Sequence, residues 1–353
     1  MQNIKISFPG HGKDKDISQF TGEKDNIFKD KKFWINSDIE ECDYWFVFED
    51  LNKLENNQTM IDRRNLIFLS AETSWTEDYY FANSKIDYLN QFQKIYLFGL
   101  KTPEDISTKK IIIDLPFLPW MINANHGDSY LSPNKRDLTY FKSLEKLNKR
   151  KTLSVICSNK DNTDFHSARF DFVKKIKKHF GEDIDWYGNG INEIETKWEG
   201  IADYKYHICI ENKSKKNLIT EKLFDSFLGL SMPIYYGAPN VSNYFSEDSF
   251  VSIDISNIDE SIKTISNLLN NDPYDEKIDS ILESKNMVCT EYNVFNRISN
   301  IVDLLNEENY KNKELIHLKS KGHYEVLNKE VKVNRTSIFY RKIKQRIKKI
   351  LNL

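Results

Sequence analysis

Residues 204–239 read YKYHICIENKSKKNLITEKLFDSFLGLSMPIYYGAP, in which two short apolar runs enclose one amphipathic run. The outer runs, YKYHICI and MPIYY, are nearly continuous in apolar residues, which is typical of strands covered on both faces of a parallel sheet. The inner run, TEKLFDSFLGL, has helical spacing and begins with Thr220, a common helix N-cap. A strand, a helix and a strand in succession predict a right-handed crossover and therefore an α/β fold.

The same alternation extends along most of the chain. Short apolar runs recur early in the sequence at IKISF, YWFVFED, NLIFLSAE, KIYLFG and IIIDLPF, and later at KTLSVICS, DIDWYG and SFVSID. The polar run KSLEKLNKRK separates the two series, and a chain of 353 residues exceeds the size at which one core usually keeps growing. We therefore predict two Rossmann-like domains, residues 1–148 and 149–305, that face each other across a cleft, with terminal helices over residues 306–353.

Composition excludes several classes of protein. Apolar residues make up 39% of the chain and charged residues 29%, which is not a disordered composition. The four cysteines lie far apart, and neither a CxxC pair nor an HExxH motif occurs, so we expect buried free thiols and no metal site. No run approaches the roughly 20 apolar residues of a membrane span, and no signal peptide is recognisable, so we expect a cytoplasmic protein.

The last segment, residues 335–353, is basic and amphipathic. In TSIFYRKIKQRIKKILNL, apolar residues from Phe339 to Leu351 recur at helical spacing, and lysines and arginines fill the other positions. Such a helix fits the surface of an anionic membrane, where each basic residue contributes about 1 kcal/mol. A solvated helix packed on its own protein explains the pattern equally well, so both interpretations stay open. Nucleic acid is not an expected partner, because basic and aromatic residues do not interleave beyond this tail.

Polar residues gather where the strand YKYHICIEN ends and the next helix begins. Glu211 and Asn212 end the strand, and Thr220, Glu221 and Lys222 open the helix. We expect them at the carboxyl edge of the sheet, where open α/β sheets bind ligands. An ordinary capped surface helix is the plain alternative for Glu221 and Lys222. The cation of Lys222, however, opposes the positive end of the helix, which indicates a diphosphate ligand.

The series YKYHICIEN, ITEKLFDSF and MPIYYGAPN resembles the donor-domain signature of the glycosyltransferase family 10 fucosyltransferases. KTLSVICSN, Arg169 in the following helix and IDWYGNG resemble the strands that precede it in that family. The resemblance implies a GT-B fold and an inverting transferase, foremost an α-1,3-fucosyltransferase that uses GDP-fucose. It implies that Arg169 and Lys222 neutralise the donor diphosphate, although by position alone Arg169 could equally be a surface cation. Asn212 and Glu221 would contact the donor, and Gly237 would shape a loop.

In the first domain, the strand RRNLIFLSAETS ends near Glu72, where the resemblance implies the catalytic base. A carboxylate there can take the proton of an acceptor hydroxyl as the hydroxyl oxygen attacks the anomeric carbon. Glu77 and Asp78 are rivals for this role, and an exposed loop acid is the plain alternative. His126, in the loop PFLPWMINANHGD, is a further candidate for the base or for an acceptor contact.

Two positions depart from the family pattern and bear on the donor sugar. Leu69 precedes Glu72 by three residues, where the family often has an aromatic residue, and Leu218 precedes Thr220 by two, where it commonly has tyrosine. A different nucleotide sugar therefore stays open, as does a non-catalytic glycan-binding protein. We expect a glycan acceptor such as lipopolysaccharide, a tail on the cytoplasmic face of the inner membrane, and no metal cofactor, because cationic side chains can neutralise the diphosphate.

Overall fold

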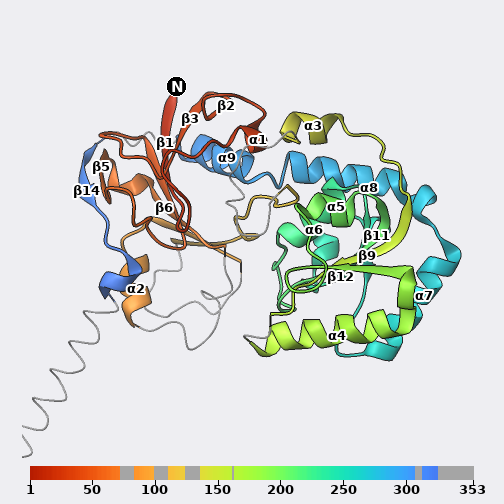
Figure 1. Cartoon of the computed structure of the whole chain (residues 1–353). Helices are drawn as coiled ribbons and strands as arrows, with labels where there is room; N and C mark the ends of the chain where they lie inside the picture. Colours follow the sequence, from red (N-terminus) through yellow and green to blue (C-terminus); the bar gives the residue numbers. More distant parts are fainter. Residues whose placement is uncertain (72–82, 99–109, 124–135, 161–162, 307–311, 325–353) are drawn as a thin grey trace, which may run out of the picture.

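The computed structural model describes residues 1–71, 83–98, 110–123, 136–160, 163–306 and 312–324. Two α/β units lie side by side, the first built mainly from the beginning of the chain and the second from its middle (Figure 1). Each unit is centred on a sheet of parallel strands, as the alternation of strand and helix in the sequence predicts. The predicted α/β class with two Rossmann-like units is confirmed.

The first sheet has the order β2-β3-β1-β4-β6-β7-β8, in which β2 and β3 are the antiparallel neighbours. Its strands are β1 (Gln2–Ser7), β2 (Ile27–Phe28), β3 (Lys31–Ile35), β4 (Tyr44–Phe48), β6 (Leu66–Leu69), β7 (Lys94–Leu97) and β8 (Ile111–Ile113). The central strand β4 is buried along its whole length, which explains its unbroken apolar sequence YWFVF. On one face, the ring of Phe68 packs edge-on against Tyr88 of helix α2 (Asn83–Leu89).

The second sheet is entirely parallel and has the order β10-β9-β11-β12-β13. Its strands are β9 (Lys151–Ile156), β10 (Ile184–Tyr187), β11 (Tyr204–Ile210), β12 (Met232–Tyr236) and β13 (Val251–Ser252). The helices of this unit are α4 (Asp164–Phe180), α5 (Lys197–Ile201), α6 (Glu221–Leu228), α7 (Ile258–Asn271) and α8 (Tyr274–Cys289). Thr220 caps α6 by accepting Lys222 N–H, and every residue of α6 after Lys222 is buried. The stretch quoted at the outset thus forms the centre of this sheet.

Helix α9 (Val294–Asn306) packs on the first unit, although it follows the second in the sequence. The ring of Phe295 lies 5.7 Å from that of Phe20 and, edge-on, 5.5 Å from that of Phe33. The structure differs here from the predicted domain bounds of 149–305. The apolar stripe of a helix shows that one face is buried but does not specify which sheet covers that face.

A strand follows α9 where the sequence analysis expected only helices over residues 306–353. This strand, β14 (Glu314–His317), pairs antiparallel with β5 (Gln58–Ile61) at the far side of the first unit. A run of four residues is too short to show a periodicity, so the pattern could not distinguish this strand from a turn of helix. The chain therefore crosses from the first unit to the second and returns.

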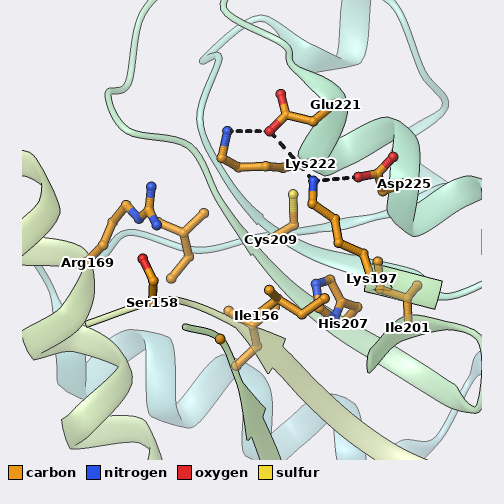
Figure 2. A pocket seen from close by; sticks show the side chains of 13 residues that line it. Ile156, Ser158, Arg169, Lys197, Ile201, His207, Cys209, Glu221, Lys222 and Asp225 are labelled. Carbon is orange, nitrogen blue, oxygen red and sulfur yellow. Dashed lines mark hydrogen bonds and ion pairs between the residues drawn. The ribbon is translucent and has the colours of Figure 1, made fainter. Parts of the chain in front are cut away.

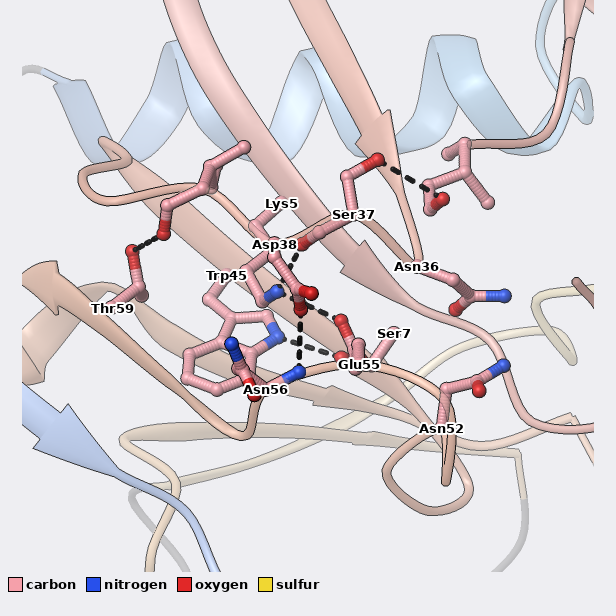
Figure 3. A network of polar contacts seen from close by, with 12 residues as sticks. Lys5, Ser7, Asn36, Ser37, Asp38, Trp45, Asn52, Glu55, Asn56 and Thr59 are labelled. Carbon is pink, nitrogen blue, oxygen red and sulfur yellow. Dashed lines mark hydrogen bonds and ion pairs between the residues drawn. The ribbon is translucent and has the colours of Figure 1, made fainter. Parts of the chain in front are cut away.

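A buried ion pair fixes one end of the first sheet (Figure 3). Lys5 Nζ lies 2.8 Å from Glu55 Oε2, and both side chains are fully buried. The ammonium also donates to Ser37 O at 2.6 Å, and Trp45 Nε1 donates to Ser7 Oγ at 2.8 Å. Burial raises the pKa of Glu55, and Lys5 opposes that rise. Loss of either partner would leave the other charge buried and uncompensated, so the pair anchors the segment around Glu55 to β1.

All four cysteines are free and buried, as predicted from their spacing. No helix in the described part of the chain combines the length and the apolar character that crossing a membrane requires. The basic tail over residues 335–353 lies outside the described residues.

Candidate functional site

The polar residues predicted to bind a donor lie at the carboxyl edge of the second sheet (Figure 2). Arg169 lies on α4, Asn212 follows β11, and Glu221 and Lys222 open α6. A pocket of about 150 Å³ lies between these elements. Its walls include Ser158, Arg169, Lys197, Ile201, Lys222 and Asp225. The structure therefore brings together cations that are far apart in the sequence.

Lys222 is held by carboxylates on two sides. Its Nζ lies 3.3 Å from Glu211 Oε2 and 3.1 Å from Glu221 Oε1, and it donates to Thr220 Oγ1 at 3.0 Å. Burial alone would lower the pKa of Lys222, but Glu211 and Glu221 outweigh burial and raise the pKa above its ordinary value. Lys222 therefore carries a full positive charge at the helix N-terminus, where a bound anion would find both the ammonium and the helix dipole.

The two carboxylates beside Lys222 have different surroundings. Glu211 is 1% exposed, and its oxygens accept the N–H and the hydroxyl of Thr220 at 2.8 Å. It therefore holds the N-cap residue of α6 in place. Glu221 lines the pocket. Burial would raise the pKa of Glu221, but Lys222 and Lys197 outweigh it and lower the pKa to about 2. Glu221 is therefore an ionised acceptor that can bind hydroxyl groups.

The side chains of Arg169 and Asn212 meet between α4 and the loop after β11. The guanidinium of Arg169 donates to Asn212 Oδ1 and lies 3.9 Å from Cys157 Sγ. Within the described residues, the buried Arg169 Nε has no hydrogen-bond partner. The side chain of Arg169 thus reaches from α4 to the loop after β11. Arg169 also lines the pocket, so its guanidinium brings a positive charge to an anion bound there.

Gly237 lies in the loop after β12, close to Glu211. A Cβ at this position would collide with the hydroxyl of Tyr235 and would lie 2.6 Å from Glu211 Cγ. That hydroxyl accepts Ala238 N–H at 2.9 Å and donates to Leu218 O at 3.3 Å. The lack of a side chain at Gly237 thus lets the loop after β12 close on the loop that carries Glu211.

Sequence reasoning missed two charged residues of the pocket, Lys197 and Asp225. Lys197 Nζ lies 2.8 Å from Asp225 Oδ2 and 3.8 Å from Glu221 Oε1. Asp225 stands four residues after Glu221, on the same face of α6, and an acid within the apolar run LFDSF was a signal that could have identified it. Lys197 offered no such signal, because its partners come from a later helix.

Other candidates of the sequence analysis cannot be placed. Glu72, Glu77, Asp78 and His126 lie outside the described residues. The described chain that leads to Glu72 is firmly held, however. The carboxylate of Glu49 accepts the hydroxyl of Ser70 at 3.1 Å, and Ser70 O accepts Phe117 N–H at 3.0 Å.

No group of three or more His, Cys, Asp or Glu side chains that could hold a metal ion occurs among the described residues. The cationic side chains that line the pocket within the described chain are Arg169, Lys197 and Lys222.

His207 lines the floor of the pocket as a neutral imidazole. Ser154 Oγ donates to Gly200 O at 2.6 Å and lies 2.8 Å from His207 Nδ1, so the hydroxyl, having a single proton, accepts from Nδ1–H. Burial lowers the pKa of His207 to about 3, with Lys197 and Lys149 adding to the shift.

This histidine should make the stability of the fold depend on pH. Between about pH 6 and pH 4 the unfolded chain binds a proton at His207 and the folded chain does not, so its contribution is present above pH 6.5 and lost as the pH falls. Relative to His207→Asn, the unaltered protein should lose about 1.4 kcal/mol more unfolding free energy per pH unit. Urea unfolding of both proteins at several pH values measures this, and parallel curves would contradict it.

Comparison with known proteins relates this edge of the sheet to a family of sugar-transferring enzymes. The sequence model described as Glycosyltransferase family 10 (fucosyltransferase) C-term matches residues 146–277. Alpha-(1,3)-fucosyltransferase FucT of Helicobacter pylori is 33% identical over 118 residues, which are 33% of this chain and 24% of that protein. 4-Galactosyl-N-acetylglucosaminide 3-alpha-L-fucosyltransferase 9 of Homo sapiens is 30% identical over 107 residues, 28% of this chain and 29% of that protein. The matched part thus spans about a quarter of the length of these relatives.

Among solved structures, a crystal structure of alpha1,3-fucosyltransferase with GDP-fucose aligns with 78% of this chain and 81% of its own, at 19% identity and a TM-score of 0.46. The family match covers the second sheet from before β9 to the beginning of α8, and with it every described residue of the pocket. Residues 146–277 thus match the model of the glycosyltransferase family 10 (fucosyltransferase) C-terminal domain, which confirms the resemblance recognised in the sequence.

Proposed function

We propose that this protein is a glycosyltransferase that takes a sugar from a nucleoside diphosphate donor, with GDP-fucose as the first candidate. One observation supports the donor class above all. Arg169 and the N-terminus of α6, with Lys222, face one pocket at the carboxyl edge of a parallel sheet. Helix N-termini with added cations bind phosphate groups, and this edge is where such sheets take their ligands.

The proposed reaction is a single displacement with inversion, as in an α-1,3-fucosyltransferase. Glu72 takes the proton of an acceptor hydroxyl, the hydroxyl oxygen forms a bond to the anomeric carbon, and the bond from that carbon to the diphosphate breaks on the opposite face. Arg169 and Lys222 stabilise the charge that develops on the departing diphosphate. The scheme requires no metal cofactor, so transfer in excess EDTA should continue.

The donor sugar is the part of the proposal with a second candidate. Leu218 stands where the family resemblance implies a tyrosine, so the side chain at this position carries no hydroxyl. It is 2% exposed, and its backbone carbonyl accepts a hydrogen bond from the Tyr235 hydroxyl. A site that hydrogen-bonds a substrate hydroxyl can discriminate by about four orders of magnitude, so this loss can change the sugar. Another nucleotide sugar on the same fold is therefore the second candidate.

For the acceptor we propose a glycan of the cell surface, such as lipopolysaccharide, glycosylated in the cytoplasm at the inner membrane. The support is the basic amphipathic pattern of residues 335–353, which suits an anionic leaflet. Co-sedimentation of the full chain with anionic and with neutral vesicles tests the membrane contact, which equal binding to both would refute.

Donor binding tests the proposal directly. A ligand that binds the folded protein at 100 times its Kd should add about 2.7 kcal/mol to the unfolding free energy. We expect GDP and GDP-fucose to stabilise the protein in this way, and GDP-fucose to be turned over with a glycan acceptor. Stabilisation by UDP-sugars but not by GDP-fucose would replace the donor and keep the class. Failure of every nucleoside diphosphate to stabilise the protein would refute the transferase proposal.

A further inference from the structure

Lys197 lies inside the candidate donor pocket without belonging to the residues that the sequence assigned to the donor. It opens the short helix α5, and its Nζ lies between Asp225 Oδ2 at 2.8 Å and Glu221 Oε1 at 3.8 Å (Figure 2). The side chain is 27% exposed, whereas that of Asp225 is 1% exposed. Burial would lower the pKa of Lys197, but Asp225 and Glu221 outweigh it and raise the pKa, so the ammonium is charged.

The charges in the pocket and directly beneath it cancel only if Lys197 is included. The charged groups concerned are Glu211, Glu221, Asp225, Arg169, Lys197 and Lys222. Without Lys197, the carboxylates outnumber the cations at any pH that keeps Asp225 ionised; burial raises the pKa of Asp225 to about 6 even with Lys197 beside it. A diphosphate that approached Arg169 and Lys222 would then enter a site of net negative charge, and like charges at close range in a partly buried site repel strongly.

We infer that Lys197 is a positioning residue for diphosphate binding: it neutralises Asp225 and Glu221, which leaves Arg169 and Lys222 available to the donor. This inference rests on the proposed function. Lys197 acts through the two acids and need not touch the diphosphate itself.

Asp225 is held in place, because the carboxylate oxygen that does not contact Lys197 accepts a backbone hydrogen bond. Asp225 Oδ1 accepts Met121 N–H at 2.8 Å, and the adjoining Ile122 O accepts Trp198 N–H of α5 at 2.9 Å. The segment around Met121 joins the first unit to the second, so the acid is tied to the connection between them. A buried carboxylate in a fixed place requires a fixed counter-charge.

The arrangement permits a charge-rescue experiment on the full chain with GDP as the probe. Lys197→Met should weaken GDP binding by about tenfold or more at pH 9, and by less at pH 7.5, because loss of Lys197 raises the pKa of Asp225 further above the value of about 6 that burial gives it. Lys197→Arg should bind GDP nearly as well as the unaltered protein. Adding Asp225→Asn to Lys197→Met should restore most of the affinity, because asparagine keeps an acceptor for Met121 N–H and removes the uncompensated charge. A purely structural role for Lys197 would give no such rescue.

Lys205→Met is the matched control. Lys205 is the second residue of β11, and its side chain is 23% exposed. Its Nζ lies 2.5 Å from Asp272 Oδ2, and neither residue lines the donor pocket. Its loss should leave the Kd for GDP unchanged, and an equal loss in both methionine variants would overturn the inference.

Other outcomes separate this inference from the proposed function. If Lys197→Met binds GDP as tightly as the unaltered protein, or if the double variant binds as weakly as the single one, charge compensation by Lys197 is refuted and the transferase proposal stands. If the unaltered protein binds UDP in place of GDP, the same variants are measured with UDP and the same results decide. If it binds neither, the proposed function fails and this inference fails with it.

Discussion

Replacing Lys222 with methionine should lower kcat/KM for sugar transfer by about two to three orders of magnitude, the usual cost of removing one group that stabilises developing charge. The ammonium is fixed by Glu211, Glu221 and Thr220 at the N-terminus of α6, so no reorganisation is needed when negative charge appears on the leaving diphosphate. Methionine keeps most of the aliphatic stem, and the loss is therefore electrostatic. Release of GDP from GDP-fucose in the presence of acceptor measures the rate.

The interpretation of that loss depends on an intact fold. Lys222→Met removes the counter-charge of Glu211, which is buried, so its unfolding free energy has to be measured beside the rate. Lys205→Met, which removes a lysine of β11 that lies outside the pocket, should keep full activity. If Lys222→Met folds normally and transfers at the unaltered rate, the diphosphate does not bind at the N-terminus of α6.

Replacing Glu72 with glutamine should lower kcat by about two to four orders of magnitude, the usual contribution of a general base, and leave GDP affinity unchanged. Glutamine has the shape of glutamate but cannot accept the proton of the acceptor hydroxyl. Glu72 is the residue next to Ala71, whose N–H is bonded to the Glu49 carboxylate, so the chain is anchored immediately before it. Turnover and calorimetric GDP titration of the same sample measure the two quantities.

The rivals for this role supply the controls. Glu77→Gln and Asp78→Asn remove the other nearby acids of the sequence, and each should retain most of its turnover. A Glu72→Gln protein that turns over as fast as the unaltered one, with the loss found in Glu77→Gln or Asp78→Asn, would move the base to that residue.

Much of the second unit was predictable because its signals are local. Near-continuous apolar runs identified β9, β11 and β12, and Thr220 marked the first turn of α6 within one residue. Parallel strands bring their carboxyl ends to one edge, so the meeting of Asn212 and Lys222 followed from topology, whereas Arg169 was expected there only from the family resemblance.

The remaining features depend on contacts between distant parts of the chain. Lys197 and Asp225 form an ion pair only when α5 and α6 pack side by side. The spacing of residues in the sequence does not predict that packing. Helix α9 has an apolar face that either sheet could cover. The role of Gly237 likewise depends on the close approach of Glu211, whose Cγ lies 2.6 Å from the place of an added Cβ and which is distant in the sequence.

The return of α9 to the first unit affects the order of events during synthesis. The rings of Phe20 and Phe33, which Phe295 covers in the folded protein, leave the ribosome long before residues 294–306 do. Domains generally fold as units from the N-terminus onward, but this first unit has to wait with apolar surface uncovered until the second has been made. A nascent chain stalled before residue 294 would therefore be a natural client for a chaperone.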